Sequence, residues 1–135
     1  MSHAIILFAH GARDPEWARP FEQLRAAVKP RLPGVPVELA YLEFMQPDLQ
    51  LAVDRLIDMG ARLIDIVPAF MAQGGHLKRD LPLLIAAAQA RHPAARFHLR
   101  AALGESPAVL NAMAACIAAD SAVSEFDRIV TDSGK

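Results

Sequence analysis

Two histidines and one glutamate are the residues of this sequence best suited to bind a metal ion or to move a proton. His10 and Glu43 each come directly after a short apolar run, and His76 follows a pair of glycines. Two imidazoles and a carboxylate suit a borderline divalent ion such as cobalt, iron, nickel or zinc. They also suit proton transfer, because histidine titrates near pH ~6.5. A single loop histidine is usually just a surface polar group, so the prediction depends on whether the fold brings the three residues together.

The elements that must position these residues alternate between strand and helix. Short apolar runs predict strands at residues 4–9, 35–42, 62–67 and 96–102. Capping residues, early prolines and apolar spacings of three and four predict helices at residues 14–32, 47–60, 80–92 and 106–122. The segment 68–79 has no single period and contains the Gly-Gly pair, so it is predicted to be a long loop.

This alternation predicts one α/β domain over residues 1–123, followed by a polar tail at 124–135. We expect a flavodoxin-like, four-stranded parallel sheet of order 2-1-3-4, with helices on both faces. In such sheets ligands bind at the carboxyl ends of the strands, where the strand order reverses. His10 and His76 would then face each other across this crevice, with Glu43 to one side.

Composition excludes several classes of protein. The chain has 135 residues, of which 53% are hydrophobic, and a formal net charge of -1, which disfavours broad nucleic-acid binding. No apolar stretch approaches the ~18 residues of a membrane helix, and the apolar start lacks the basic region of a signal peptide. The single cysteine, Cys116, is expected to be a small buried residue and excludes an internal disulfide. We therefore expect a protein of the reducing cytoplasm.

The last predicted helix is apolar nearly all round, with Asn111 and Asp120 as the main exceptions. A helix of this kind needs cover on more than one side, which the outer layer of a monomer does not offer. Its alanines would allow two subunits to approach closely. The sequence thus predicts a two-fold homodimer that uses this helix.

Three segments carry a resemblance to a known family. ILFAHGAR at residues 6–13, YLEFMQP at 41–47 and PAFMAQGGHLKRDLP at 68–82 resemble the small sirohydrochlorin chelatases. These are the class II tetrapyrrole chelatases of sirohaem and anaerobic cobalamin synthesis. The similarity runs in matching order from about residue 4 to residue 120. Ala9 and Ala12 depart from it, since the family often has glycine and serine there.

The resemblance implies a chelatase-like fold and a lyase that inserts Co²⁺, Fe²⁺ or Ni²⁺ into sirohydrochlorin, with no cofactor beyond this metal substrate. The family's two metal-handling histidines map onto His10 and His76, and its acidic residue maps onto Glu43. Toward such a substrate, we expect the cations to pair with carboxylates and the apolar loop side chains to cover a ring face. The cations are Arg13, Lys78 and Arg79. The apolar side chains are Phe70 and Met71. The chain matches the short form of the family, and the resemblance implies a homodimer, in which two copies of one module replace the duplicated pair of the longer chelatases.

Three other functions remain open at this stage. A non-enzymatic carrier of divalent metal ions would use the same histidines. A phosphate-binding flavodoxin-like module is disfavoured because the loop after the first strand has only Gly11, where phosphate-cradling motifs have several glycines. A histidine phosphoryl-transfer enzyme would typically have arginine immediately before the histidine, where this chain has Ala9.

Overall fold

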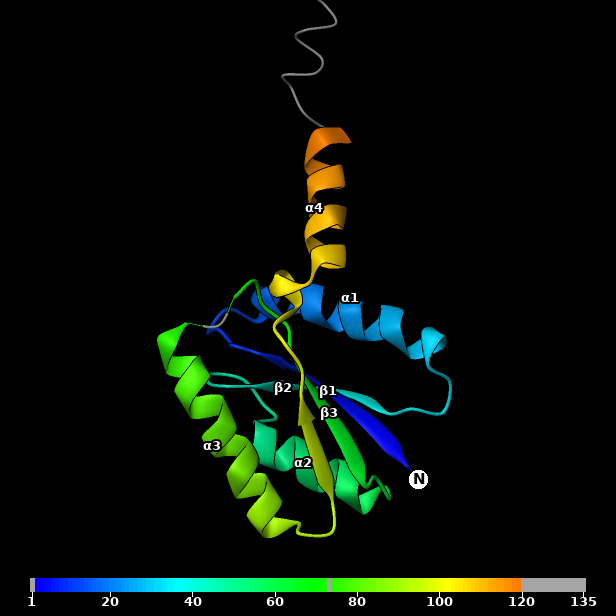
Figure 1. Cartoon of the computed structure of the whole chain (residues 1–135), viewed down its shortest axis with the longest axis vertical. Coiled ribbons are helices and arrows are strands. Elements are labelled where there is room, and N and C mark those ends of the chain that lie inside the picture. Colours follow the sequence, from blue (N-terminus) through cyan, green and yellow to red (C-terminus); the bar gives the residue numbers. More distant parts are fainter. Residues whose placement is uncertain (1, 73, 120–135) are drawn as a thin grey trace, which may run out of the picture.

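The computed structural model describes residues 2–72 and 74–119 as a parallel sheet of order β2-β1-β3-β4 with helices on both faces (Figure 1). The strands are β1 (His3–Ala9), β2 (Val37–Tyr41), β3 (Leu63–Pro68) and β4 (Arg96–Leu99). The helices are α1 (Arg19–Val28), α2 (Leu49–Asp58), α3 (Gly75–Arg91) and α4 (Pro107–Ala119). Short 3₁₀ turns lie at η1 (Pro15–Ala18), η2 (Lys29–Arg31) and η3 (Leu103–Glu105). The predicted fold class is confirmed.

Strand β1 is central and is buried on both faces, which explains its uninterrupted apolar sequence. Ile6 and Phe8 point into one apolar layer, where buried side chains of α2 and α3 cover the sheet. Ile5 and Leu7 point into the other layer, against the apolar face of η1 and α1. That face consists of the residues predicted from their spacing, namely Trp17, Phe21, Leu24 and Val28.

The predicted helix starts are partly confirmed. The Asp14 carboxylate accepts a hydrogen bond of 3.0 Å from the Glu16 N–H, but it caps the turn η1 rather than α1 itself. The Asp48 carboxylate accepts a bond of 2.9 Å from the Leu51 N–H and begins α2. These caps satisfy N–H groups that a helix end leaves free.

Helix α3 begins at Gly75, earlier than the sequence pattern indicated. The predicted loop over 68–79 was therefore too long, and His76, Lys78 and Arg79 belong to the helix. The sequence pattern predicts a helix start near residue 80, with Pro82 in its first turn, because proline lacks the N–H that an interior helical bond needs. Pro82 lies inside α3, where Leu77 and Leu81 before it and Ala88 after it are buried against the core.

Helix α4 projects away from the sheet and its covering helices (Figure 1). None of its residues is buried along the described length, so the prediction of a buried Cys116 was wrong and the thiol is exposed. The predicted end of this helix near Ala122 and the predicted tail 124–135 lie outside the described residues. Among the described helices, none combines the length and hydrophobicity that crossing a membrane would require.

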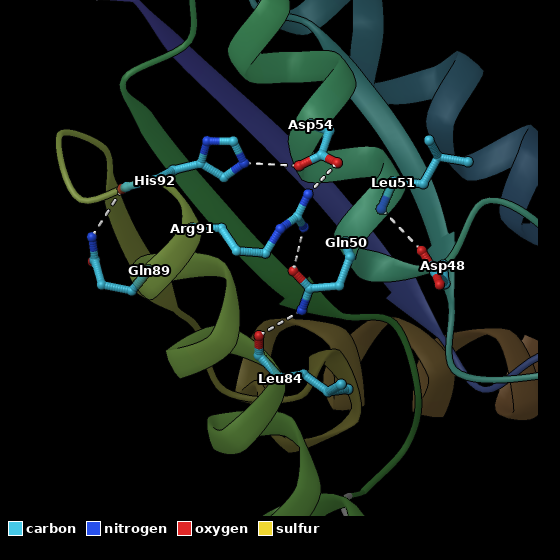
Figure 2. A network of polar contacts seen from close by, with 8 residues as sticks. All are labelled: Asp48, Gln50, Leu51, Asp54, Leu84, Gln89, Arg91 and His92. Carbon is cyan, nitrogen blue, oxygen red and sulfur yellow. Dashed lines mark hydrogen bonds and ion pairs between the residues drawn. The ribbon is translucent and has the colours of Figure 1, made fainter.

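A network of polar contacts joins α2 to the C-terminal end of α3 (Figure 2). The Asp54 carboxylate accepts hydrogen bonds from Arg91, at 2.5 Å, and from the ring of His92, at 2.8 Å. Arg91 also donates to the side chain of Gln50, which in turn donates to the Leu84 carbonyl. The hydrogen bond from Arg91, and then that from His92, hold the pKa of Asp54 below its ordinary value of 3.8.

Replacing Asp54 by asparagine is expected to lower the free energy of unfolding at neutral pH by about 1 kcal/mol, because the substitution removes both charge-assisted bonds. The stabilisation exists above the unfolded pKa of 3.8 and is lost as the pH falls through the lower folded value. Urea unfolding at neutral pH, and at steps from about pH 5 to about pH 3, measures both effects.

Asp58→Asn is the matched control, since Asp58 is an exposed residue of the same helix. It should change the free energy of unfolding by less than about 0.5 kcal/mol. If Asp54→Asn lost stability toward acid as steeply as the unsubstituted chain, the contribution assigned to Asp54 would be wrong.

Candidate functional site

His10 and Glu43 meet at the carboxyl ends of two neighbouring strands. His10 follows β1 and Glu43 follows β2, and the His10 Nε2 lies 3.0 Å from the Glu43 Oε1. Both side chains are about half exposed, at 52% and 48%, so the pair is accessible to an ion from solvent. The structure thereby brings together two of the three predicted metal-handling residues.

Backbone pairing continues past the strand ends and fixes this contact. The Leu42 N–H donates to the Ala9 carbonyl at 3.0 Å, and the Glu43 N–H donates to the His10 carbonyl at 3.1 Å. The first bond continues the parallel pairing of β1 and β2 just past its last register pair, Ala9 and Tyr41, and the second joins the two loops beyond it. The two side chains are therefore positioned by the sheet rather than by a separate loop structure.

Gly11 allows the two segments to come this close. Its φ of +93° is a backbone conformation that residues with a Cβ rarely adopt. A Cβ at this position would also stand 1.9 Å from the Glu43 carbonyl oxygen. Both the conformation and the contact require glycine here.

The pair can serve a metal ion in two ways. When a neutral His10 ring donates from Nε2 to Glu43, its lone pair lies on Nδ1, which can bind an ion while the carboxylate orients the ring. Alternatively both atoms can hold one ion between them. With bond lengths near ~2.1 Å, a separation of 3.0 Å gives a ligand–metal–ligand angle of about 90° and leaves the other positions open.

His76 is on a different structural element from His10 and Glu43. It is an exposed residue in the first turn of α3. Within residues 2–72 and 74–119, no three side chains among histidine, cysteine, aspartate and glutamate are placed to hold one metal ion together. The structure thus pairs His10 with Glu43 but does not gather His76 with them. The three-residue metal site stays a prediction.

The predicted substrate-binding cations are all exposed. Lys78 and Arg79 are on the first turns of α3, close in sequence to His76. The guanidinium of Arg13 lies 4.9 Å above the centre of the Phe44 ring, in a cation–π contact. Phe44 is 57% exposed and has a φ of +66°, which sequence reasoning had not indicated.

The two predicted apolar binding residues differ in exposure. Phe70 is partly buried and packs against the core, whereas Met71 is 60% exposed. The backbone of both is fixed by η3: the Gly104 N–H donates to the Phe70 carbonyl at 3.0 Å. A Cβ on Gly104 would stand 2.1 Å from the Met71 carbonyl oxygen. Met71 thus fits the predicted exposed surface, and Phe70 is largely a core residue.

A hollow of about 370 Å³ lies beside β2 and is lined by neither His10 nor Glu43. Its wall includes Glu22, Arg25 and Tyr41. Burial, and then the negative charge of Glu22, raise the pKa of the Tyr41 hydroxyl above its ordinary value. Because the candidate ligand atoms lie elsewhere, we place the site at the strand ends and not in this hollow.

Comparisons with known proteins agree on one family. The model of the CbiX family matches residues 4–119. The sirohydrochlorin cobaltochelatase of Methanocaldococcus jannaschii is 36% identical over 89 residues, which are 66% of this chain and 62% of that protein. The matched part spans only 57–62% of the length of the curated relatives.

Two solved structures share the fold. A CbiX protein from Marinobacter aquaeolei VT8, described as one of cobalamin biosynthesis, superposes with a TM-score of 0.77 and 30% identity over 93% of this chain and 98% of that one. The sirohydrochlorin chelatase SirB from Bacillus subtilis subspecies spizizenii, in complex with cobalt, gives a TM-score of 0.71 and 25% identity. That match covers 78% of this chain and 45% of SirB.

Replacing Gly11 by alanine is expected to lower the free energy of unfolding by about 2–4 kcal/mol, because the new Cβ must displace the Glu43 backbone. The same shift should separate His10 from Glu43, which the NMR signals of the His10 ring would report. Chemical denaturation measures the loss of stability.

Gly34→Ala is the matched control. Gly34 also has a positive φ, of +81°, but a Cβ there would meet nothing within 4 Å. It should cost only the backbone strain, about 1–2 kcal/mol. If Gly11→Ala and Gly34→Ala lowered the free energy of unfolding equally, the close approach to the Glu43 backbone would not be the reason for glycine at position 11.

Proposed function

The chain belongs to the CbiX family, and we propose from this that it is a chelatase that inserts Co²⁺ or Fe²⁺ into sirohydrochlorin, with Ni²⁺ as a third candidate ion. The His10–Glu43 pair at the strand ends is the observation that supports the proposal most directly. The names of the relatives support it too, since they include a sirohydrochlorin cobaltochelatase and a chelatase in complex with cobalt. The reaction needs no cofactor beyond the metal ion, which is itself a substrate.

Metal insertion exchanges two pyrrole protons for one divalent ion. The barriers are removal of water from the ion, its alignment with the ring, and removal of the two protons. In our proposal, His10 replaces part of the water shell, and His76 joins it from the start of α3. Glu43, which lies within hydrogen-bond distance of His10, accepts one released proton, and solvent water takes up the other. An incomplete protein ligand set favours transfer, because a closed four-ligand site would retain the ion.

The exposed cations are suited to the acidic groups of the tetrapyrrole. Arg13, Lys78 and Arg79 are exposed, and a guanidinium can bind a carboxylate through two parallel hydrogen bonds. Met71 supplies apolar surface on the loop that leads to His76. Phe70 contributes to a lesser extent, because it packs partly into the core.

We also propose that the protein is a homodimer in the cytoplasm. Helix α4 is almost entirely apolar in sequence, yet it buries none of its side chains along its described length. Leu110 and Ile117 are 45% and 74% exposed on it. A second copy of this chain would cover such a helix through a self-complementary contact. The reducing cytoplasm suits an exposed free thiol at Cys116.

Replacement of His10 by alanine, or of Glu43 by glutamine, is expected to lower kcat/KM for cobalt insertion about a hundredfold or more. The first change removes the metal ligand, and the second removes the proton acceptor. The change in the absorption spectrum of sirohydrochlorin on metallation, followed at fixed Co²⁺ concentration, measures the rate.

His98→Ala is the matched control, because His98 is also bonded to a carboxylate, that of Asp65 at 2.9 Å, but on β4. It should retain nearly the full rate. A folded His10→Ala variant with an unchanged rate would refute the metal-handling role. If the unsubstituted chain bound Co²⁺ without accelerating insertion over the uncatalysed reaction, the protein would be a metal carrier instead.

The dimer proposal predicts that Leu110→Asp and Ile117→Asp each convert the protein from two copies to one, because a charge would be buried at the contact. Sedimentation velocity measures the mass. Leu83→Asp is the control, since Leu83 is a 68% exposed apolar residue of α3 and should leave the mass unchanged. A monomeric unsubstituted chain at high protein concentration would disprove the proposal.

A further inference from the structure

Phe44 has a backbone conformation and an exposure that its role in folding does not explain. Its φ of +66° lies in the left-handed region, where a Cβ crowds the backbone and glycine or asparagine would be relaxed. Its ring contributes little to the core, because 57% of the residue is exposed. A bulky aromatic residue that is both strained and exposed indicates a functional constraint at this position.

The position of Phe44 is set by the same pairing that positions the candidate metal site. Pairing with the β1 side extends as far as Glu43, and Phe44 is the next residue. Consecutive Cα atoms are about 3.8 Å apart, so the ring is attached immediately beside the His10–Glu43 pair. A metal ion alone would gain nothing from an apolar ring at this point, whereas a flat organic ligand would.

Arg13 gives the same surface a positive charge. Its guanidinium lies over the Phe44 ring, 4.9 Å from the ring centre. Arg13 comes from the loop after β1 and Phe44 from the loop after β2, so each contributes from one side of the His10–Glu43 contact. A planar aromatic ring and a planar cation, both accessible to solvent, match a ligand that is flat, conjugated and rich in carboxylates.

We propose that Phe44 and Arg13 form the surface that holds the tetrapyrrole ring against the metal site. The conjugated ring stacks on Phe44, and one peripheral carboxylate pairs with Arg13. This inference rests on the proposed function and adds to it a substrate-binding residue, Phe44. The left-handed conformation of Phe44 then serves to direct the aromatic side chain to the substrate, although glycine would stabilise the turn more.

The test measures binding of metal-free sirohydrochlorin by absorption titration, which requires no turnover. Phe44→Gly should raise the Kd for sirohydrochlorin about tenfold, because it removes the stacking surface. Phe44→Trp should retain the affinity. The Kd for Co²⁺ alone should change less than twofold in both variants.

Phe44→Gly should also be at least as stable to urea as the unsubstituted chain, because glycine relaxes the positive φ. If the role of Phe44 were merely structural, Phe44→Gly would be less stable to urea than the unsubstituted chain.

Two further variants sharpen the result. Leu83→Ala removes an apolar side chain from α3 that is at least as exposed as Phe44, at 68% against 57%, and should leave the Kd for sirohydrochlorin unchanged. Arg13→Ala should weaken binding as well. Because Phe44 and Arg13 form one surface, the Kd for sirohydrochlorin of the double variant should rise by less than the product of the two single fold-changes.

The outcomes separate this inference from the proposed function. If the unsubstituted chain binds sirohydrochlorin in a Phe44-dependent way but inserts no metal, the chelatase proposal fails and the stacking surface stands. If the chain inserts metal while Phe44→Gly binds the ring as tightly as the unsubstituted chain, the stacking surface is overturned and the chelatase proposal stands. If the chain neither binds the ring nor inserts metal, both are overturned.

Discussion

The close contact between the loops after β1 and β2 is the constraint on which the candidate site depends. Two backbone hydrogen bonds join the chain segments just past the paired strands, and this close approach requires that Gly11 presents no Cβ to the Glu43 carbonyl. Through this contact the sheet fixes His10 and Glu43 at 3.0 Å and places Phe44 one residue further on. The site therefore takes its rigidity from the sheet, which is the most buried part of the fold.

The covering of the sheet is uneven, and this affects both stability and assembly. Helices α2 and α3 bury one face and are joined at one end by the Asp54–Arg91–His92 network. The other face is covered by α1. Helix α4 has the hydrophobicity of a core element but the exposure of a surface element. Within a domain of this size, apolar surface of that extent is expected to be covered by another molecule.

Sequence periodicity was sufficient for the fold class, since each predicted strand is present and the alternation with helices gave the parallel sheet. The strand order came from the expectation of a flavodoxin-like sheet, and the structure confirms it. Periodicity was not sufficient for the start of α3. Leu77 and Leu81 already show the helical spacing, but Pro82 and the paired glycines masked it. Only the packed core shows that burial of these two leucines outweighs the cost of a proline within the helix.

The candidate site was predictable only in part. The rule that ligands bind at the carboxyl ends of strands identified His10 and Glu43 from sequence, and the structure pairs them. The left-handed conformation of Phe44 and its contact with Arg13 depend on how two loops meet, and no local pattern encodes that. The outward direction of α4 likewise depends on what covers the sheet, so an apolar sequence alone predicted burial of Cys116 wrongly.

In the described part of the chain, no third ligand is gathered with the His10–Glu43 pair, and this suits the reaction we propose, in which the ion must be released as well as bound. A pair with a ligand angle of about 90° can remove part of the water shell while leaving coordination positions for the pyrrole nitrogens. His76 is on a different element, the first turn of α3, so in the proposed reaction it would join or leave the ion without disturbing the His10–Glu43 pair. A rigid three-histidine or four-ligand site would bind more tightly, yet it would oppose the transfer on which insertion depends. A fixed pair and a third residue on a separate element would therefore suit the metal delivery that we propose.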